Sequence, residues 1–225
     1  KKGCGRMDFA FIQQYIPLYI EAAKLTLAIA GIGILLSVLI GLICAYAGYY
    51  KVPVLRNIAA VYIELSRNTP LLVQLFLLYF GLPKIGISLS STACGIIGLS
   101  FLGGSYMAES FRSGLESIDK VQISAGMSVG LTQNQIMRYI IFPQALSVSI
   151  PGIIANIIFL IKETSVFSVI ALPDLMYVAK DLIGLYYKTD EALLMLVITY
   201  LIILLPISLF ASWLERRLRY AGFGS

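Results

Sequence analysis

The stretch LTLAIAGIGILLSVLIGLICAYAGYY, residues 25–50, contains no charged residue. A helix needs about 20 mostly apolar residues to cross a bilayer, so this stretch is long enough to span one. The whole chain of 225 residues has the same character, because 59% of its residues are hydrophobic and only 13% are charged. A soluble domain has about 25% charged residues. The chain therefore has too few charges to cover a water-exposed surface, and we expect an integral membrane protein.

Four further segments extend this pattern. Three of them, residues 85–108, 139–161 and 192–214, are uncharged and long enough to cross a bilayer. The fourth, residues 57–83, is interrupted by Glu64 and Arg67, which lie three positions apart and can pair on a helix. The sequence therefore predicts an all-α integral membrane protein with five transmembrane helices.

The charges at the two ends predict the orientation. Arg216, Arg217 and Arg219 follow the last span, and cytoplasmic loops are enriched in Lys and Arg, so we expect a cytoplasmic C-terminus. An odd number of spans then places the N-terminus outside. Residues 1–6, KKGCGR, precede Met7 and resemble an expression remnant. Residues 7–225 are expected to form a single transmembrane domain in the cytoplasmic membrane.

The composition also excludes several kinds of chemistry. The chain has no His, so a His-based triad or metal site cannot form. Its three cysteines are far apart and are expected to be small apolar fillers. The net charge of +5 is typical of cytoplasmic loops in a membrane protein rather than of nucleic-acid binding. No G-x-x-x-x-G-K-[ST] motif is present, so ATP hydrolysis would require another subunit.

The loop between the third and fourth spans is the most informative one. Asp119 followed by Gln122 resembles a capping box, and Gly130 has the place of a C′ glycine. These signals predict a short helix over residues 120–129. The alternation of apolar residues over 121–131 is a strand pattern, and it leaves a strand as the alternative.

A second helix is predicted directly after this turn. Thr132 followed by Gln135 again resembles a capping box. We expect the helix to cover residues 133–142 and to end before Pro143.

The segment over residues 173–184 is expected on the outer side. Four apolar residues recur there at helical spacing after Asp174, namely Leu175, Val178, Ala179 and Leu182. This spacing predicts a short amphipathic helix at the outer surface.

Polar residues within or beside apolar runs are the candidates for substrate binding. Glu163 could hold an ammonium group, and Lys162 could hold a carboxylate or extend to the interface. An interfacial pair at the end of the fourth span is the alternative. Gln74 and Asn156 could bind substrate or link helices to one another. The candidate set is Glu163, Lys162, Thr164, Gln74 and Asn156.

Three strings resemble one known family. The first, SAGMSVGLTQNQIMRYIIFPQAL (124–146), resembles the E-A-A-x-x-x-G loop of ABC importer permeases. The others, ELSRNTPLLVQLFLLYFGLP (64–83) and LIKETSVFSVIALPDL (160–175), resemble segments of permeases for polar amino acids. The sequence departs from the pattern with Ser124 for Glu, Gly126 for the second Ala and Asn68 for Gly.

The resemblance implies a type I ABC importer permease that carries a polar amino acid by alternating access. It implies a second permease subunit, an extracytoplasmic substrate-binding protein, and ATP-binding cassette subunits that would hold ATP and Mg²⁺. The short helix would then be a cytoplasmic coupling helix that docks on the ATPase, with contacts from Ser124, Ala125, Gly126, Met127 and Gly130. The alternatives are a proton-driven transporter that uses Glu163 and an assembly subunit without a substrate path.

Overall fold

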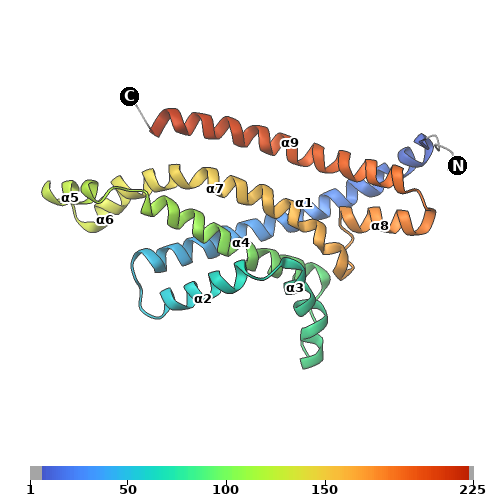
Figure 1. The fold of residues 1–225 in the computed structure, drawn as a ribbon, viewed down its shortest axis with the longest axis horizontal. Helices are drawn as coiled ribbons and strands as arrows, with labels where there is room; N and C mark the ends of the chain where they lie inside the picture. The colour runs from blue at the N-terminus through green and yellow to red at the C-terminus, as the bar shows by residue number, and fades with distance from the viewer. Residues whose placement is uncertain (1–6, 223–225) are drawn as a thin grey trace. The chain divides into compact units, whose positions relative to one another are not determined.

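The structure is a computed structural model that describes residues 7–222, with side chains described for residues 7–217. The expected remnant, residues 1–6, lies outside the described residues. The described chain is built from helices (Figure 1). In chain order they are α1 (Phe9–Tyr49), α2 (Leu55–Arg67), α3 (Leu71–Phe76), the π-helix η1 (Leu77–Gly81), the 3₁₀-helix η2 (Leu82–Ile85), α4 (Ser91–Glu116), α5 (Lys120–Ser128), α6 (Gln133–Ile136), the π-helix η3 (Met137–Ile141), α7 (Phe142–Glu163), the 3₁₀-helix η4 (Thr164–Ile170), α8 (Leu175–Tyr186) and α9 (Thr189–Gly222).

The chain divides into two compact units. The first contains the described residues up to Gly33, together with Leu71–Leu99 and Leu160–Ile207. The second contains Ile34–Pro70, Ser100–Phe159 and the described residues from Ser208 onward. The boundary falls inside α1, α4, α7 and α9, so each of these helices contributes residues to both units.

Within the described residues, three helical stretches are long and apolar enough to cross a membrane. They are Phe9–Tyr49, Gln133–Ile170 and Thr189–Arg217, and they contain three of the predicted spans. The predicted span over residues 85–108 falls largely on α4, which begins only at Ser91. The protein is therefore a multi-pass, all-helical membrane protein, and the number of five spans stays a prediction.

The predicted span over residues 57–83 is not one continuous helix. Helix α2 ends at Arg67 and α3 begins at Leu71, directly after Pro70. Proline has no N–H to donate and disfavours helical geometry in the residue before it, which explains the interruption. The predicted pairing of Glu64 with Arg67 is also absent. The Glu64 carboxylate instead accepts a hydrogen bond from Asn68 Nδ2 at 3.1 Å.

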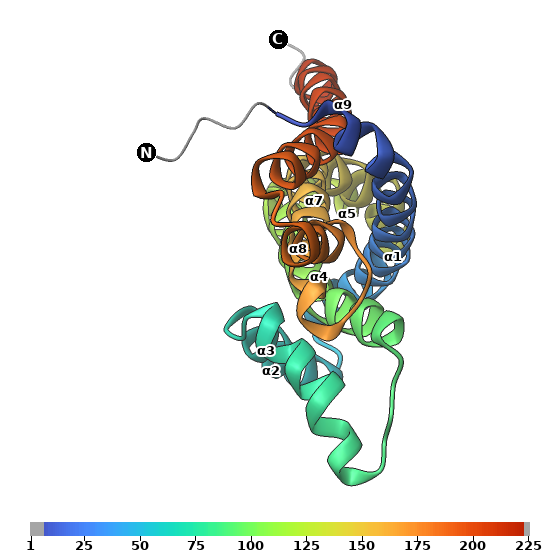
Figure 2. The same ribbon diagram turned by 90° about the vertical axis from the view of Figure 1, so that its right-hand side faces the viewer.

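In the first unit, α8 packs its apolar face into the core. The four residues predicted to form that face, Leu175, Val178, Ala179 and Leu182, are all buried together with residues of α1 and α9. Figure 2 shows α8 beside the first part of α9. The Leu175 N–H donates to Thr26 Oγ1 of α1 at 3.3 Å, and the Tyr19 hydroxyl donates to the Ala192 carbonyl at 2.7 Å. The predicted helix is present, and its apolar face is covered by protein.

In the second unit, α4 lies close to both α1 and α7. A Cβ atom built on Gly41 of α1 would lie 2.5 Å from Met107 Cβ. A Cβ atom built on Gly114 of α4 would lie 2.4 Å from the Ala145 carbonyl oxygen of α7. These distances are too short for a side chain, so glycine permits both close approaches.

Candidate functional site

The loop between α4 and α7 contains the predicted short helix. Helix α5 spans Lys120–Ser128, which confirms the prediction over residues 120–129 and makes the strand alternative wrong. The Asp119 carboxylate caps it by accepting a hydrogen bond from the Val121 N–H at 2.9 Å. The capping box predicted with Gln122 is not the arrangement seen. Gln122 Oε1 instead accepts a hydrogen bond from Gln144 Nε2 of α7 at 2.7 Å, because that helix starts close by.

Gly130 ends α5 in the conformation that the sequence predicts. Its φ angle is 85°, in the left-handed region that residues with a Cβ atom rarely adopt. The Gly130 N–H donates to the Met127 carbonyl at 3.0 Å, and the Leu131 N–H donates to the Gly126 carbonyl at 3.1 Å. This pair of bonds is a Schellman motif. The turn therefore favours glycine for a local reason, independent of any partner.

The second predicted helix begins as expected and ends differently. Both hydrogen bonds of the capping box between Thr132 and Gln135 are present at the start of α6. The predicted end before Pro143 is wrong, because α6 continues through a π turn into α7. In that turn the Phe142 N–H donates to the Met137 carbonyl. The wider turn accommodates a proline, which cannot donate in the first turn of α7.

The two helices of the loop pack tightly on each other (Figure 1). Gly126 of α5 is buried, and a Cβ atom built on it would lie 3.0 Å from Ile136 Cγ1 and 3.1 Å from Ile140 Cδ1. The small size of Gly126 is therefore explained by packing within the chain. The other four residues predicted to dock on a partner are exposed, namely Ser124, Ala125, Met127 and Gly130.

Large apolar side chains are also exposed on this loop. Val121 is 69% exposed, Met127 is 50% exposed and Val129 is 78% exposed. In water, exposed apolar side chains do not stabilise a short helix that lies outside the predicted spans. Together with the exposed docking candidates, these residues form a surface that we call the α5 surface. Its chemistry suits an apolar groove on another protein.

Four of the substrate candidates lie in the first unit. Helix α7 ends at Glu163, which is half-buried, whereas Lys162 is exposed. Within residues 7–217, no salt bridge involves either side chain. Thr164 is buried and its hydroxyl donates to the Ile161 carbonyl at 2.7 Å. Gln74 is buried on α3, which packs against η4, the segment that follows Glu163. The fold thus brings the helix of Gln74 to the segment that begins with Thr164.

Asn156, the fifth candidate, lies in the second unit. Its Nδ2 donates to the Tyr106 carbonyl at 3.1 Å and to Ser110 Oγ at 2.9 Å. Both acceptors belong to α4, so the amide links α7 to α4. The sequence left two roles for Asn156, substrate binding and linking helices, and these hydrogen bonds link two helices.

An ion pair between α2 and α4 was missed by the sequence analysis. Arg67 Nη1 lies 3.5 Å from Glu109 Oε2, and the Arg67 guanidinium lies 5.4 Å from the centre of the Tyr106 ring. Glu109 also accepts a hydrogen bond from Arg112 Nε at 3.1 Å. Glu109 directly follows the uncharged run that ends at residue 108. This position at the end of a predicted span is the one sequence feature that marks Glu109 as a candidate. The partnership with Arg67 cannot be read from spacing because the two residues belong to different helices.

Comparison with known proteins gives one consistent result. The family described as "Binding-protein-dependent transport system inner membrane component" matches residues 37–220. The Probable glutamine ABC transporter permease protein GlnP of Bacillus subtilis is 43% identical over 180 residues, covering 79% of this chain and 83% of that protein. The Glutamine transport system permease protein GlnP of Escherichia coli K12 is 32% identical over 216 residues, covering 95% of this chain and 99% of that protein.

Solved structures agree with the sequence relatives. A chain from the "Crystal structure of an amino acid ABC transporter with histidines" has a TM-score of 0.88 and 32% identity, with 95% of this chain and 100% of that chain covered. A chain of the MetNI methionine ABC transporter in an inward-facing conformation has a TM-score of 0.73 and 19% identity, covering 91% of this chain and 98% of that chain. The second similarity concerns the fold alone.

Proposed function

Because this chain belongs to the family of binding-protein-dependent transport system inner membrane components, a family of ABC importer permeases, we propose that it carries a polar amino acid inward by ATP-driven alternating access. The names of relatives support the substrate class, since several are permeases for glutamine or amino acids. A second permease subunit, an extracytoplasmic binding protein and ATP-binding cassette subunits would complete the transporter. ATP and Mg²⁺ would bind in the cassette subunits.

The observation that carries the proposal is the α5 surface. Its helix is capped at both ends and packs against α6. Apolar residues nevertheless remain exposed on it, where a groove on an ATPase would cover them. ATPase closure would move this helix together with the helices joined to it as rigid bodies. A cytoplasmic C-terminus, as the arginines near the end of α9 predict, puts the loop on the side where ATP is available.

We assign substrate recognition to Glu163 and its neighbours in the first unit. A half-buried carboxylate at the end of an apolar helix is costly unless it faces a cavity or a partner. An amino acid offers an ammonium group to Glu163, and the amide of Gln74 is suited to its polar groups. The Thr164 hydroxyl donates to the Ile161 carbonyl, so toward an amino acid it can act only as an acceptor. Lys162 is the candidate for the carboxylate of the substrate. Asn156 keeps the role of a link between helices that could also line the path.

Uptake into proteoliposomes tests the proposal. The chain is reconstituted with its ATPase and binding protein, and uptake of labelled glutamine is measured with and without ATP. We expect uptake that requires ATP and is inhibited by other polar amino acids but not by apolar ones. Uptake that persists without ATP and follows a proton gradient would contradict the proposal in favour of proton-driven transport.

Two carboxylate variants test the assignment of the site. Glu163→Gln should lower uptake at least tenfold, whereas Glu21→Gln should leave it unchanged because Glu21 is exposed and its salt bridge within residues 7–217 is with Lys24 of its own helix. Unchanged uptake in Glu163→Gln would remove Glu163 from the substrate path. If the wild-type chain also shows no uptake, the result favours an assembly subunit without a substrate path.

A further inference from the structure

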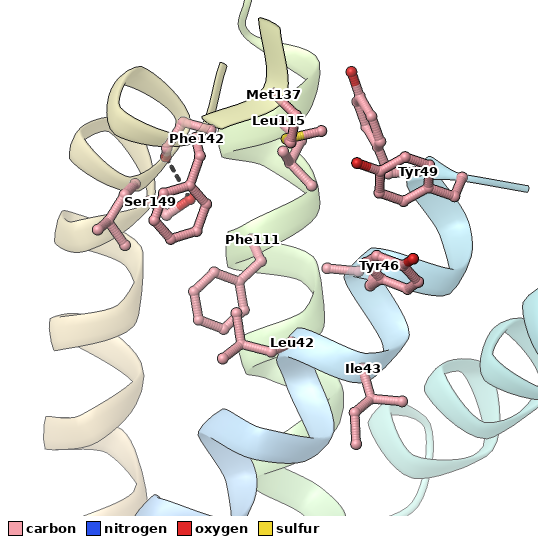
Figure 3. A pocket seen from close by; sticks show the side chains of 13 residues that line it. Leu42, Ile43, Tyr46, Tyr49, Phe111, Leu115, Met137, Phe142 and Ser149 are labelled. Carbon is pink, nitrogen blue, oxygen red and sulfur yellow. Dashed lines mark hydrogen bonds between the residues drawn. The ribbon is translucent and has the colours of Figure 1, made fainter. Parts of the chain in front are cut away.

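An apolar cavity lies within the second unit between α1, α4 and α7. Its volume is about 440 Å³, which is within the usual range for ligand-binding cavities. Figure 3 shows Leu42, Phe111 and Phe142 facing the hollow from the three helices. The hydroxyl of Ser149 is also on the lining, and it already donates to the Ala145 carbonyl at 2.8 Å. The cavity therefore offers contact to hydrocarbon and little to a polar ligand.

The cavity is open at its rim and adjoins membrane-spanning helices. Leu42 is 40% exposed, Tyr46 is 58% exposed and Phe142 is 52% exposed. The lining residues of α1 and α7 belong to stretches that are long and apolar enough to cross a membrane. In a bilayer the surrounding medium is lipid, so a hydrocarbon chain is the molecule available to fill such a cavity.

The side chain of Lys51 lies beside this apolar cavity. Two further cavities, of about 370 and 310 Å³, share Tyr49 with it, and Lys51 lines both of them. Arg56 lines the larger of the two. Within residues 7–217 no carboxylate forms a salt bridge with Lys51 or Arg56. Arg112 and Glu116 also line the larger cavity and pair with each other. The cavities beside the apolar one therefore hold more positive than negative charge, next to tyrosine side chains, the arrangement found where membrane helices reach the headgroup level.

The backbone at Lys51 strengthens the case for a role of its charge. Lys51 has a φ angle of 51° and occupies the C′ position of α1. Its N–H donates to the Gly48 carbonyl at 3.3 Å, and the Val52 N–H donates to the Ala47 carbonyl at 3.0 Å, which is again a Schellman motif. Glycine is favoured at this position, and lysine is strained there. The turn would form more easily with glycine at position 51. The backbone conformation therefore gives no reason for a lysine there.

We propose that this is a binding site for an anionic phospholipid. One acyl chain occupies the cavity between α1, α4 and α7, and the headgroup phosphate is held by the ammonium of Lys51, with Arg56 nearby. The acyl chain gives no preference for one lipid over another, because all lipid tails are equally apolar. The headgroup sets the preference, which should be about fivefold for a single added cation near the membrane surface.

Quenching of tryptophan fluorescence by brominated lipids tests the proposal. The chain has one tryptophan, Trp213, so Trp213→Phe gives a silent background. Phe142→Trp then reports on the cavity, with Leu42→Trp as a second reporter should the first fail to fold. Leu205→Trp, at an α9 position that is 53% exposed, is the matched reporter on a surface away from the cavity lining. The full chain is reconstituted in phosphatidylcholine with increasing phosphatidylglycerol, one of the two lipids being brominated.

The cavity reporter should be quenched with about fivefold preference for phosphatidylglycerol, and the Leu205→Trp reporter should show none. Lys51→Gly removes the cation and relieves the backbone, so it should abolish the preference without loss of folded protein. Equal quenching by both lipids at the cavity would overturn the headgroup site. Absence of quenching by either lipid at both cavity positions would show that protein, such as a second copy of this chain, covers the cavity.

Discussion

Two of the short helices, α5 and α8, use their apolar residues in different ways. Helices α5 and α8 are both capped by an aspartate, Asp119 and Asp174. Helix α8 buries Leu175, Val178, Ala179 and Leu182 in the first unit and leaves Leu185, near its end, exposed. Helix α5 leaves Val121, Met127 and Val129 exposed. An apolar residue stabilises a fold only where the fold covers it, so the buried residues of α8 stabilise the first unit, and the exposed residues of α5 belong to the surface that we propose docks on the ATPase.

The largest expected effect on stability concerns the buried side of this comparison. Leu175→Ala removes a fully buried side chain from α8 and should lower the free energy of unfolding by about 2–5 kcal/mol. Thermal unfolding in detergent measures the change. Leu185→Ala, on the same helix at a position that is 63% exposed, is the control and should change stability by less than about 0.5 kcal/mol. Similar losses in both variants would contradict the packing of α8.

Asp174, the aspartate that caps α8, should make stability depend on pH. Burial raises the pKa of Asp174 to about 6, above its ordinary value of 3.8. The folded state then binds more protons than the unfolded state between these values, so the contribution of Asp174 to stability increases as pH falls from 7 to 4. The gain is about 3 kcal/mol at most.

Asp174→Asn keeps a capping side chain and removes the titration, so it should abolish this part of the pH dependence. Unfolding curves of the variant and the wild type at pH 7, 6, 5 and 4 would measure the difference. A constant difference in stability across that range would show that Asp174 does not titrate there.

A smaller effect is expected where α5 packs on α6. Gly126→Leu would place a side chain against Ile136 and Ile140 and should cost about 1–3 kcal/mol through overpacking. Ala125→Leu adds the same bulk at the neighbouring exposed position and should be almost neutral for stability. Chemical unfolding of the two variants side by side checks this contrast. A neutral Gly126→Leu would mean that α5 is not held against α6.

The smallest effect on stability is expected on the exposed side of α5. Val121→Ser changes a side chain that is 69% exposed and should alter the free energy of unfolding by less than about 0.5 kcal/mol. The thermal midpoint of the isolated chain provides the measurement. A clear loss of stability would indicate that Val121 is covered within the fold, and α5 would then resemble α8.

Local signals in the sequence predicted the local structure well. The aspartate cap of α5, the left-handed turn at Gly130 and the capping box of α6 each depend on residues within five positions of one another. The apolar face of α8 was predicted from its helical spacing. Such features depend on nearby residues, so the chain order contains the information that they need.

Contacts between distant segments could not be predicted in the same way. Glu64 and Arg67 have a suitable spacing for pairing, but Arg67 pairs with Glu109 of α4. Gly126 occupies a position of the family's docking loop, where the family has Ala, but it is buried against Ile136 inside the chain. Gln122 bonds to Gln144 instead of closing its own capping box. In each case a neighbour from another helix competes with the local arrangement, and spacing along the chain does not reveal that neighbour.

The most direct test of the account replaces Val129, which is 78% exposed beside the end of α5, with aspartate. Co-purification of the ATPase subunit and ATP-dependent uptake are measured with Leu185→Asp on α8 as the matched control. The account predicts that Val129→Asp loses the ATPase subunit and lowers uptake at least tenfold with an unchanged thermal midpoint, whereas Leu185→Asp keeps both. Retention of the subunit and of uptake in Val129→Asp would contradict the claim that α5 docks on the ATPase.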